Sequence, residues 1–186
     1  MQINLDPAQT MFFRAAMACR ATNDVRDYLH RLYFVDNEIV ATDGHILFWT
    51  RHWGDAVQPG LLVDVDALKL PAKVARVDMD FSHDAVELAG YDKKDAPAMT
   101  ATLPCEKGKY ANYQSVMSAT LSKYDEVPPP VISAKQIQPV EKAIGARWTR
   151  IETVSASHIF RLHFGGGGDY LNEPEWYKCL VMGWRI

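Results

Sequence analysis

The sequence predicts an α+β fold built from three similar β-α-β-β-β units. One order of patterns, a short strand, a helix and three further strands, occurs three times at a spacing of about 60 residues, and such a period indicates internal repetition. Hydrophobic residues make up 48% of the 186 residues, which is enough for a buried core. A proline run, Pro128-Pro129-Pro130, separates the third unit from the first two.

The first unit begins with a strand and an amphipathic helix. Residues 2–5 alternate between polar and apolar side chains, as in a strand. Asp6 is a suitable N-cap, and Pro7 is favoured at the first helical position. Apolar residues then recur at helical spacing, so we expect a helix over residues 7–20.

A three-stranded antiparallel meander completes the first unit. Residues 28–35, 38–42 and 45–51 are rich in aromatic and β-branched side chains, which favour strands. Asp36-Asn37 and Asp43-Gly44 separate these strands. Asn, Asp and Gly tolerate the positive φ of two-residue hairpin turns, so we expect one such turn at each place.

The second and third units repeat this order less regularly. In the second unit we expect a strand, a helix interrupted by Pro71 and three strands, at residues 61–64, 65–76, 77–82, 85–90 and 98–105. A linker over residues 118–130 follows, and its prolines favour an extended conformation. In the third unit we expect a strand, a helix ended by Gly145 and three strands, at residues 131–133, 135–144, 150–155, 158–164 and 176–186.

The formal net charge of −3 is unevenly distributed. The predicted helical stretches, taken as residues 6–20, 66–76 and 134–150, contain nine basic and three acidic residues, so they carry +6 and the rest of the chain carries −9. If all helices lie on one face of a sheet, that face is basic and suits phosphate backbones without reading sequence. The alternative is that Lys and Arg occur there as good helix formers on a solvated face.

Several other function classes have little support. Cys19, Cys105 and Cys179 are odd in number and far apart, which argues against a disulfide framework or a cysteine-based zinc site and favours a cytoplasmic location. No run approaches the roughly 20 apolar residues of a membrane span. Asp43 and His45 lack a dedicated nucleophile motif, so we expect a turn there and not a catalytic site. We expect no enzyme activity, no cofactor and no metal.

At residues 40–47, VATDGHIL, the chain resembles the bacterial replicative sliding clamp, the beta subunit of DNA polymerase III, whose middle domain carries a V-A-T-D-G-H-R-L hairpin. The preceding stretch DVRDYLHRLYF is similar as well. YANYQSV at residues 110–116 resembles the clamp's F-P-D-Y-x-x-V, and LVMGWRI at residues 180–186 resembles its terminal V-M-P-M-R-L. The resemblance covers one full clamp domain and the second half of another.

This resemblance implies a DNA-clamp fold, in which helices face a central hole and sheets lie outside. It implies a complete clamp-like domain at residues 1–117 and a half domain at residues 131–186, so the chain is a truncated clamp. The implied function is that of a sliding-clamp-like, non-enzymatic DNA replication processivity factor in a bacterial or phage-infected bacterial cell. Its implied partners are duplex DNA, bound non-specifically, and DNA polymerase or clamp-loader-type peptides.

The resemblance also implies which residues meet these partners. The helical cations would face DNA, namely Arg14, Arg20, Lys69, Lys73, Arg76, Lys135, Lys142 and Arg147. A cleft for peptides would be lined by Thr42, Gly44, His45, Leu47, Val116, Leu180, Val181, Met182, Trp184 and Arg185. A groove of Leu, Val and Met suits apolar peptide side chains. The alternative is that these residues are ordinary strand-core side chains.

The chain departs from the family at several cleft positions. Ile46 stands where the family has Arg, Ala111 and Gly183 where it has Pro, and Trp184 where it has Met. Peptide specificity would therefore differ from that of the family.

Two questions follow from the shortened chain. The third unit has no partner unit after it, and an exposed sheet edge invites pairing, so we expect a homo-oligomer in which this unit pairs with its counterpart in a second copy. The alternative function is a clamp-like adaptor or decoy that binds clamp-interacting peptides without encircling DNA.

Overall fold

The computed structural model describes residues 1–52, 54–118, 133–155, 159–165 and 177–182, and for residues 147–155, 165 and 182 it describes the backbone alone. The first unit opens with β1 (Gln2–Leu5) and α1 (Pro7–Cys19), as expected. Asp6 Oδ1 accepts the Gln9 amide at 2.8 Å and Gln9 Oε1 accepts the Asp6 amide at 3.2 Å. This capping box explains why the helix starts at Pro7.

The meander of the first unit consists of β2 (Leu32–Asp36), β3 (Glu38–Thr42) and β4 (Ile46–Arg51). Val35 pairs with Glu38, and Asp36 has a φ of 50°, so the two-residue turn predicted at Asp36-Asn37 is confirmed. The prediction of a strand from residue 28 is wrong, because residues 27–30 form the short 3₁₀ helix η1 (Asp27–His30). The Leu29 amide bonds to the Arg26 carbonyl at 3.0 Å, and this local bond replaces strand pairing.

The second unit consists of β5 (Val57–Val63), β6 (Arg76–Phe81), β7 (Ala85–Tyr91) and β8 (Pro97–Lys107), and the helix predicted over residues 65–76 is wrong. Residues 65–75 instead make isolated turns, in which the Leu68 amide bonds to Val65 at 3.0 Å and the Val74 amide bonds to Pro71 at 3.1 Å. Pro71 has no amide hydrogen, so it interrupts the ladder that a helix needs.

The third unit consists of α3 (Ala134–Ile144), β9 (Arg147–Ser155), β10 (Ile159–Gly165) and β11 (Tyr177–Met182). Gly145 ends α3 in the left-handed conformation with a φ of 72°, as predicted. Ser133 is the N-cap of α3, and the rest of the strand predicted at residues 131–133 lies outside the described residues. The proline linker lies outside them as well, apart from residue 118.

The described strands form one sheet in the order β1-β6-β7-β8-β5-β2-β3-β4-β11-β10-β9. The first strand of each of the first two units pairs with the other unit, because β1 joins β6 and β5 joins β2. Through these two strand pairings, the first two units share one continuous sheet over residues 1–107.

Strand β11 of the third unit pairs antiparallel with β4 of the first unit in the same chain, with Leu180 opposite Leu47 and Cys179 opposite Phe48. The expectation that the third unit needs a second copy to cover its sheet is therefore wrong for this edge. The pairing satisfies the backbone groups that would otherwise invite another chain. Among the described strands, β1 and β9 remain at the two ends of the sheet.

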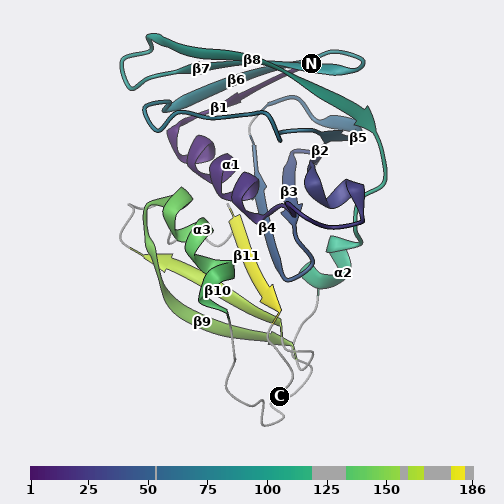
Figure 1. Cartoon of the computed structure of the whole chain (residues 1–186), viewed down its shortest axis with the longest axis vertical. Coiled ribbons are helices and arrows are strands. Elements are labelled where there is room, and N and C mark those ends of the chain that lie inside the picture. The colour runs from purple at the N-terminus through teal and green to yellow at the C-terminus, as the bar shows by residue number, and fades with distance from the viewer. Residues whose placement is uncertain (53, 119–132, 156–158, 166–176, 183–186) are drawn as a thin grey trace.

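Helix α1 lies at the centre of the molecule, between the β1, β6, β7 and β8 strands above it and α3 below it (Figure 1). It packs against α3, β3 and β4. Tyr177 of β11 stacks on Phe12 of α1 at 5.0 Å between ring centroids and on Phe48 of β4 at 6.0 Å. The core of the first unit is thus continuous with that of the third.

The three cysteines are free and buried. Within the described residues, no helix is long and apolar enough to cross a membrane.

Candidate functional site

A small cavity lies where the β3–β4 hairpin, the segment after β8 and the β10–β11 pair meet. Its volume is about 130 Å³. The lining is mostly apolar and consists of Arg26, Leu29, Thr42, Gly44, His45, Ile46, Leu47, Ala111, Asn112, Tyr113, Val116, Ile159 and Leu180. These residues come from five separate parts of the sequence, so only the folded chain forms this cavity.

The β3–β4 turn positions the hairpin wall of the cavity. Asp43 Oδ1 accepts the amides of His45 and Ile46, each at 2.8 Å, and the Thr42 hydroxyl accepts the Gly44 amide at 3.0 Å. The Asp43 amide bonds to the Ile46 carbonyl, so Gly44 and His45 are the central residues of the turn. The prediction that Asp43 and Gly44 are central is wrong by one residue, because Asp43 serves as the side-chain acceptor instead.

Two tyrosines hold the opposite wall. The Thr42 amide donates to the Tyr110 hydroxyl at 3.0 Å, and the Tyr110 ring stacks on Tyr33 at 5.2 Å with an interplanar angle of 7°. The helix α2 (Tyr113–Met117) follows, and the Tyr113 hydroxyl donates to Glu38 Oε2 at 2.7 Å. Burial raises the pKa of Tyr110 and of Tyr113, and for Tyr113 the Glu38 carboxylate adds to the rise. Both hydroxyls therefore remain protonated at neutral pH.

Two predicted cleft residues, Leu180 and Val181, are neighbours on β11 and lie on opposite faces of the sheet. Leu180 is 2% exposed and packs with Leu47, Tyr113 and Ile159 on the cavity side of the sheet. Val181 is fully buried and packs in the main core on the other side. Successive strand residues point to opposite faces, so only Leu180 can line the cavity.

The structure brings together the predicted residues Thr42, Gly44, His45, Leu47, Val116 and Leu180 around the cavity, and it excludes Val181 from the lining. Met182 is placed by its backbone at the end of β11, while Trp184 and Arg185 lie outside the described residues.

Sequence reasoning missed seven lining residues, namely Arg26, Leu29, Ile46, Ala111, Asn112, Tyr113 and Ile159. Six of them fall within the stretches 24–34, 40–47 and 110–116 that carry the family resemblance. Ile159 had no such signal.

Arg26 places a charge at the rim of the cavity. Its Nε and Nη2 donate to the two carboxylate oxygens of Asp24, each at 2.9 Å. This pairing holds the pKa of the Asp24 carboxyl well below its usual range. The guanidinium lies over Gly44, where an added Cβ would come within 3.1 Å of Arg26 Nη2.

Three of the predicted DNA-facing cations bind other groups of the chain, namely Arg14, Arg20 and Arg76. Arg14 of α1 donates to the carbonyls of Leu70 at 2.7 Å, Pro71 at 2.5 Å and Val74 at 3.0 Å. It therefore caps the irregular residues 65–75. Burial lowers the pKa of the Arg14 guanidinium from its ordinary value.

Arg20 and Arg76 form ion pairs. Arg20 Nη1 lies 2.5 Å from Asp66 Oδ1. Arg76 lies at the start of β6 and not on a helix, where it pairs with Asp78 at 2.6 Å and with Asp95 at 3.1 Å. The basic charge of the predicted helical face is thus smaller than the sequence alone suggests.

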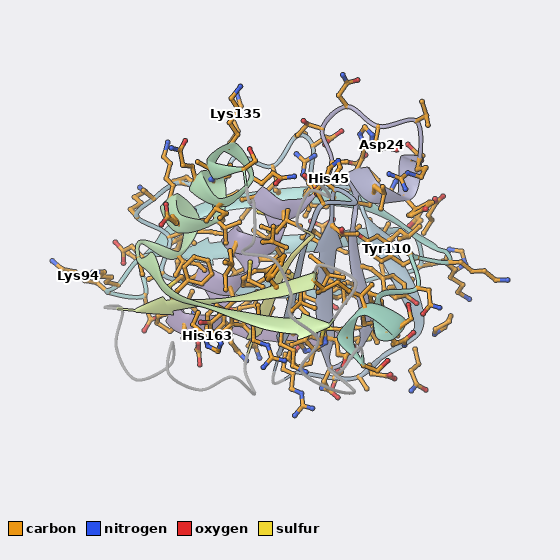
Figure 2. All side chains as sticks on the ribbon, turned by 90° about the horizontal axis from the view of Figure 1, so that it is seen from below. Asp24, His45, Lys94, Tyr110, Lys135 and His163 are labelled. Atoms are coloured by element: carbon orange, nitrogen blue, oxygen red, sulfur yellow. The ribbon has the colours of Figure 1, made fainter. Side chains whose placement is uncertain are left out.

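Four predicted cations remain exposed, namely Lys69, Lys73, Lys135 and Lys142. Lys135 extends away from α3 into solvent (Figure 2). Lys142 lines a groove of about 560 Å³ between α1, residues 65–75 and α3. Arg147 is placed by its backbone at the start of β9.

No group of three or more His, Cys, Asp or Glu side chains that could hold a metal ion occurs among the described residues.

No protein-family model and no curated protein matches the sequence. Solved structures do match. The Borrelia burgdorferi DNA polymerase III subunit beta, in complex with a natural product, superposes with a TM-score of 0.62 at 12% identity. The Streptococcus pneumoniae DNA polymerase III beta chain gives 0.58 at 14% identity, and the Pseudomonas aeruginosa sliding clamp bound to griselimycin gives 0.58 at 12% identity.

Each superposition covers 100% of this chain and 63%, 65% or 66% of the clamp, so the chain spans about two thirds of the clamps' length. The fold is that of the DNA polymerase III beta sliding clamps, and the predicted fold class is confirmed. The identities of 12–14% establish the fold alone.

Proposed function

We propose that this protein is a clamp-like, non-enzymatic processivity factor that acts in the cytoplasm of a bacterial or phage-infected bacterial cell. It binds a short apolar peptide of a DNA polymerase or repair protein and retains that partner on duplex DNA. The observation that carries the proposal is the cavity between the β3–β4 hairpin, α2 and the β10–β11 pair, together with the clamp fold.

The size of the cavity favours a peptide side chain as its occupant. Pockets for whole small-molecule ligands measure roughly 300–1,000 Å³, whereas this cavity measures about 130 Å³. Leu47, Val116 and Leu180 provide an apolar lining for an aliphatic or aromatic anchor. The tyrosine and aspartate contacts described above hold the walls in place before binding, which reduces the entropy cost of association.

Two neighbouring residues of β11 allow a matched test of the cleft. Leu180→Ala removes a lining side chain, and Val181→Ala removes a core side chain of similar size on the opposite face. The readout is the fluorescence anisotropy of a labelled bacterial polymerase peptide that binds its own sliding clamp. We expect Leu180→Ala to weaken binding about tenfold or more, which corresponds to about 1.4 kcal/mol. Val181→Ala should lower stability and leave the affinity unchanged. Equal affinities for the two variants would refute the cleft.

Retention on DNA is proposed to depend on the exposed lysines around α3 and residues 65–75. Replacing Lys69, Lys73, Lys135 and Lys142 by Glu should reduce the affinity for duplex DNA at low salt and flatten its salt dependence. Lys93→Glu/Lys94→Glu, in the exposed β7–β8 loop, is the control and should retain most of the binding.

The internal contacts of Arg14, Arg20 and Arg76 favour a second candidate function, the adaptor or decoy that binds clamp-interacting peptides without DNA. If the unmodified protein does not bind duplex DNA at low salt while Leu180→Ala weakens peptide binding, this second function replaces the first.

A homo-oligomer is proposed as well, because β1 and β9 end the sheet with unpaired edges among the described strands. Light scattering at increasing concentration tests it, and a monomer throughout would contradict it.

A further inference from the structure

A group of cations lies beside the cavity on the same face of the sheet. We call it the basic platform; it consists of the two cations, Arg51 and Lys178, and the Trp49 ring that they contact. Trp49 follows Leu47 by two residues on β4, and Lys178 precedes Leu180 by two residues on β11. Trp49 and Lys178 are directly opposite each other in the β4–β11 register, as are Leu47 and Leu180. Since alternate strand residues share a face, the platform continues the apolar cavity lining along the same two strands.

The cations of the platform lie against the indole. The Arg51 guanidinium carbon and the Lys178 ammonium nitrogen each lie 5.5 Å from the Trp49 ring centroid. The Trp49 ring is covered, because the residue is only 4% exposed. Two cations on one ring gain from its π face but repel each other.

Among the described residues, no acid forms an ion pair with the cations of the platform. Neither Arg51 nor Lys178 forms a salt bridge with the residues that the structure describes, whereas Arg26 at the other rim is paired with Asp24. Among the described side chains, the acid that faces the platform is Glu38, which lies opposite Arg51 in the β3–β4 register and already accepts the Tyr113 hydroxyl.

The pKa of Lys178 is lowered by burial and, in part, by this excess of positive charge. Burial lowers it first, and the charges of Arg161 and Arg51 lower it further, while Glu38 offsets part of the effect. An anion placed between Arg51 and Lys178 would relieve this repulsion.

We propose that the basic platform recognises a carboxylate of the bound peptide, so that the preferred partner segment is an apolar anchor followed or preceded, about two residues away, by Asp or Glu. Two residues along a strand span about 7 Å, so an extended peptide with its anchor beside Leu47 and Leu180 reaches the platform after the same number of residues. This inference rests on the proposed peptide cleft and adds the charge of its ligand.

A peptide fits the platform better than a nucleic acid does. The platform carries two cations beside an apolar cavity, whereas binding to a phosphate backbone uses many cations along an extended surface. The same partner can therefore fill the cavity and reach the platform.

Two labelled twelve-residue peptides test the inference. They share a central Leu-Leu-Phe and differ only in the flanks, which carry Asp-Asp on both sides in one peptide and Asn-Asn in the other. At about 50 mM salt we expect the acidic peptide to bind about tenfold more tightly, since exposed charges act over about one Debye length. Arg51→Gln/Lys178→Gln should remove this difference and leave the affinity for the Asn peptide unchanged. Lys94→Gln, which lies on the opposite side of the molecule from Tyr110 (Figure 2), should preserve it.

The outcomes separate the inference from the proposed function. If both peptides bind equally and Leu180→Ala weakens both, the cleft stands and the platform is not a recognition site. If neither peptide nor the polymerase peptide binds, the cleft itself fails and the inference fails with it. If Arg51→Gln/Lys178→Gln instead reduces binding of a labelled single-stranded DNA oligomer and spares the acidic peptide, the platform serves nucleic acid and the inference is overturned. Thermal unfolding of each variant verifies that the fold is retained.

Discussion

The Tyr113 hydroxyl donates a 2.7 Å hydrogen bond to Oε2 of Glu38, 75 residues earlier in the chain. Tyr113 begins α2 and is 4% exposed, and Glu38 begins β3. One charge-assisted bond thus ties the wall that carries Val116 to the hairpin that carries Leu47. Together with the bond from the Thr42 amide to the Tyr110 hydroxyl, it joins the two cavity walls.

Tyr113→Phe removes this hydrogen bond and keeps the ring. We expect a loss of about 1–2 kcal/mol in the free energy of unfolding, because bonds to charged groups are worth about 1.5–3 kcal/mol and Glu38 can partly rehydrate. Urea denaturation measures it. Tyr91→Phe is the control, since the Tyr91 hydroxyl makes no hydrogen bond with the described residues and its ring contact with Arg76 survives. A loss as large in Tyr91→Phe would show that the Glu38 bond is not the cause.

Arg14→Met removes three hydrogen bonds to the carbonyls of residues 65–75. We expect a destabilisation of about 2–3 kcal/mol, because these carbonyls lose charged donors. We also expect faster tryptic cleavage after Lys69 and Lys73, which are exposed in that segment. Arg14→Lys should give an intermediate result, since an ammonium cannot reproduce the planar fork. Lys135→Met, an exposed change on α3, should leave both readouts near those of the unmodified protein.

His52 makes stability depend on pH. It is 1% exposed, and burial lowers the pKa of its imidazole to about 4. The unfolded chain has a histidine pKa of about 6.5. Between this pH and about 4, the unfolded state therefore binds a proton, whereas the buried imidazole of the folded state stays neutral. Stability from this group is therefore complete above pH 6.5 and falls by about 3 kcal/mol as the pH drops to 4.

His52→Gln should remove this part of the pH dependence, because Gln remains neutral throughout. Urea midpoints measured at half-unit steps from pH 7 to 4 give the comparison. The exposed His83 provides the control, and His83→Gln should retain the full slope. If the urea midpoints of the unmodified protein and of His52→Gln changed with pH in parallel, His52 would not be the source of the pH dependence.

Gly44→Ala and Gly145→Ala form a matched pair. Both glycines have positive φ, 90° and 72°, so both substitutions should cost about 1–2 kcal/mol of stability. An added Cβ at Gly44 lies 3.1 Å from Arg26 Nη2, whereas at Gly145 it meets nothing within 4 Å. We therefore expect only Gly44→Ala to displace the Arg26 side chain and change peptide affinity. Anisotropy titrations with the polymerase peptide check this, and an equal effect of Gly145→Ala would contradict it.

The sequence by itself determined much of the local structure and the fold class. The N-cap at Asp6, the turn at Asp36-Asn37 and the left-handed stop at Gly145 depend on local backbone chemistry, so short patterns predict them. The resemblance in residues 40–47 and 110–116 pointed to segments that do meet around the cavity.

Tertiary structure alone decided the features that depend on distant partners. Pro71 interrupts the helical spacing of residues 65–75 locally, but only the fold shows that Arg14, from α1, binds the carbonyls of Leu70, Pro71 and Val74 in the turns that replace the helix. Which of Leu180 and Val181 lines the cavity depends on the register between β11 and β4, two strands that are also in contact through Tyr177 and Phe48. The basic platform arises in the same way, because Lys178 meets Trp49 only where these strands pair. Such contacts join residues more than 50 positions apart, and no local pattern encodes them.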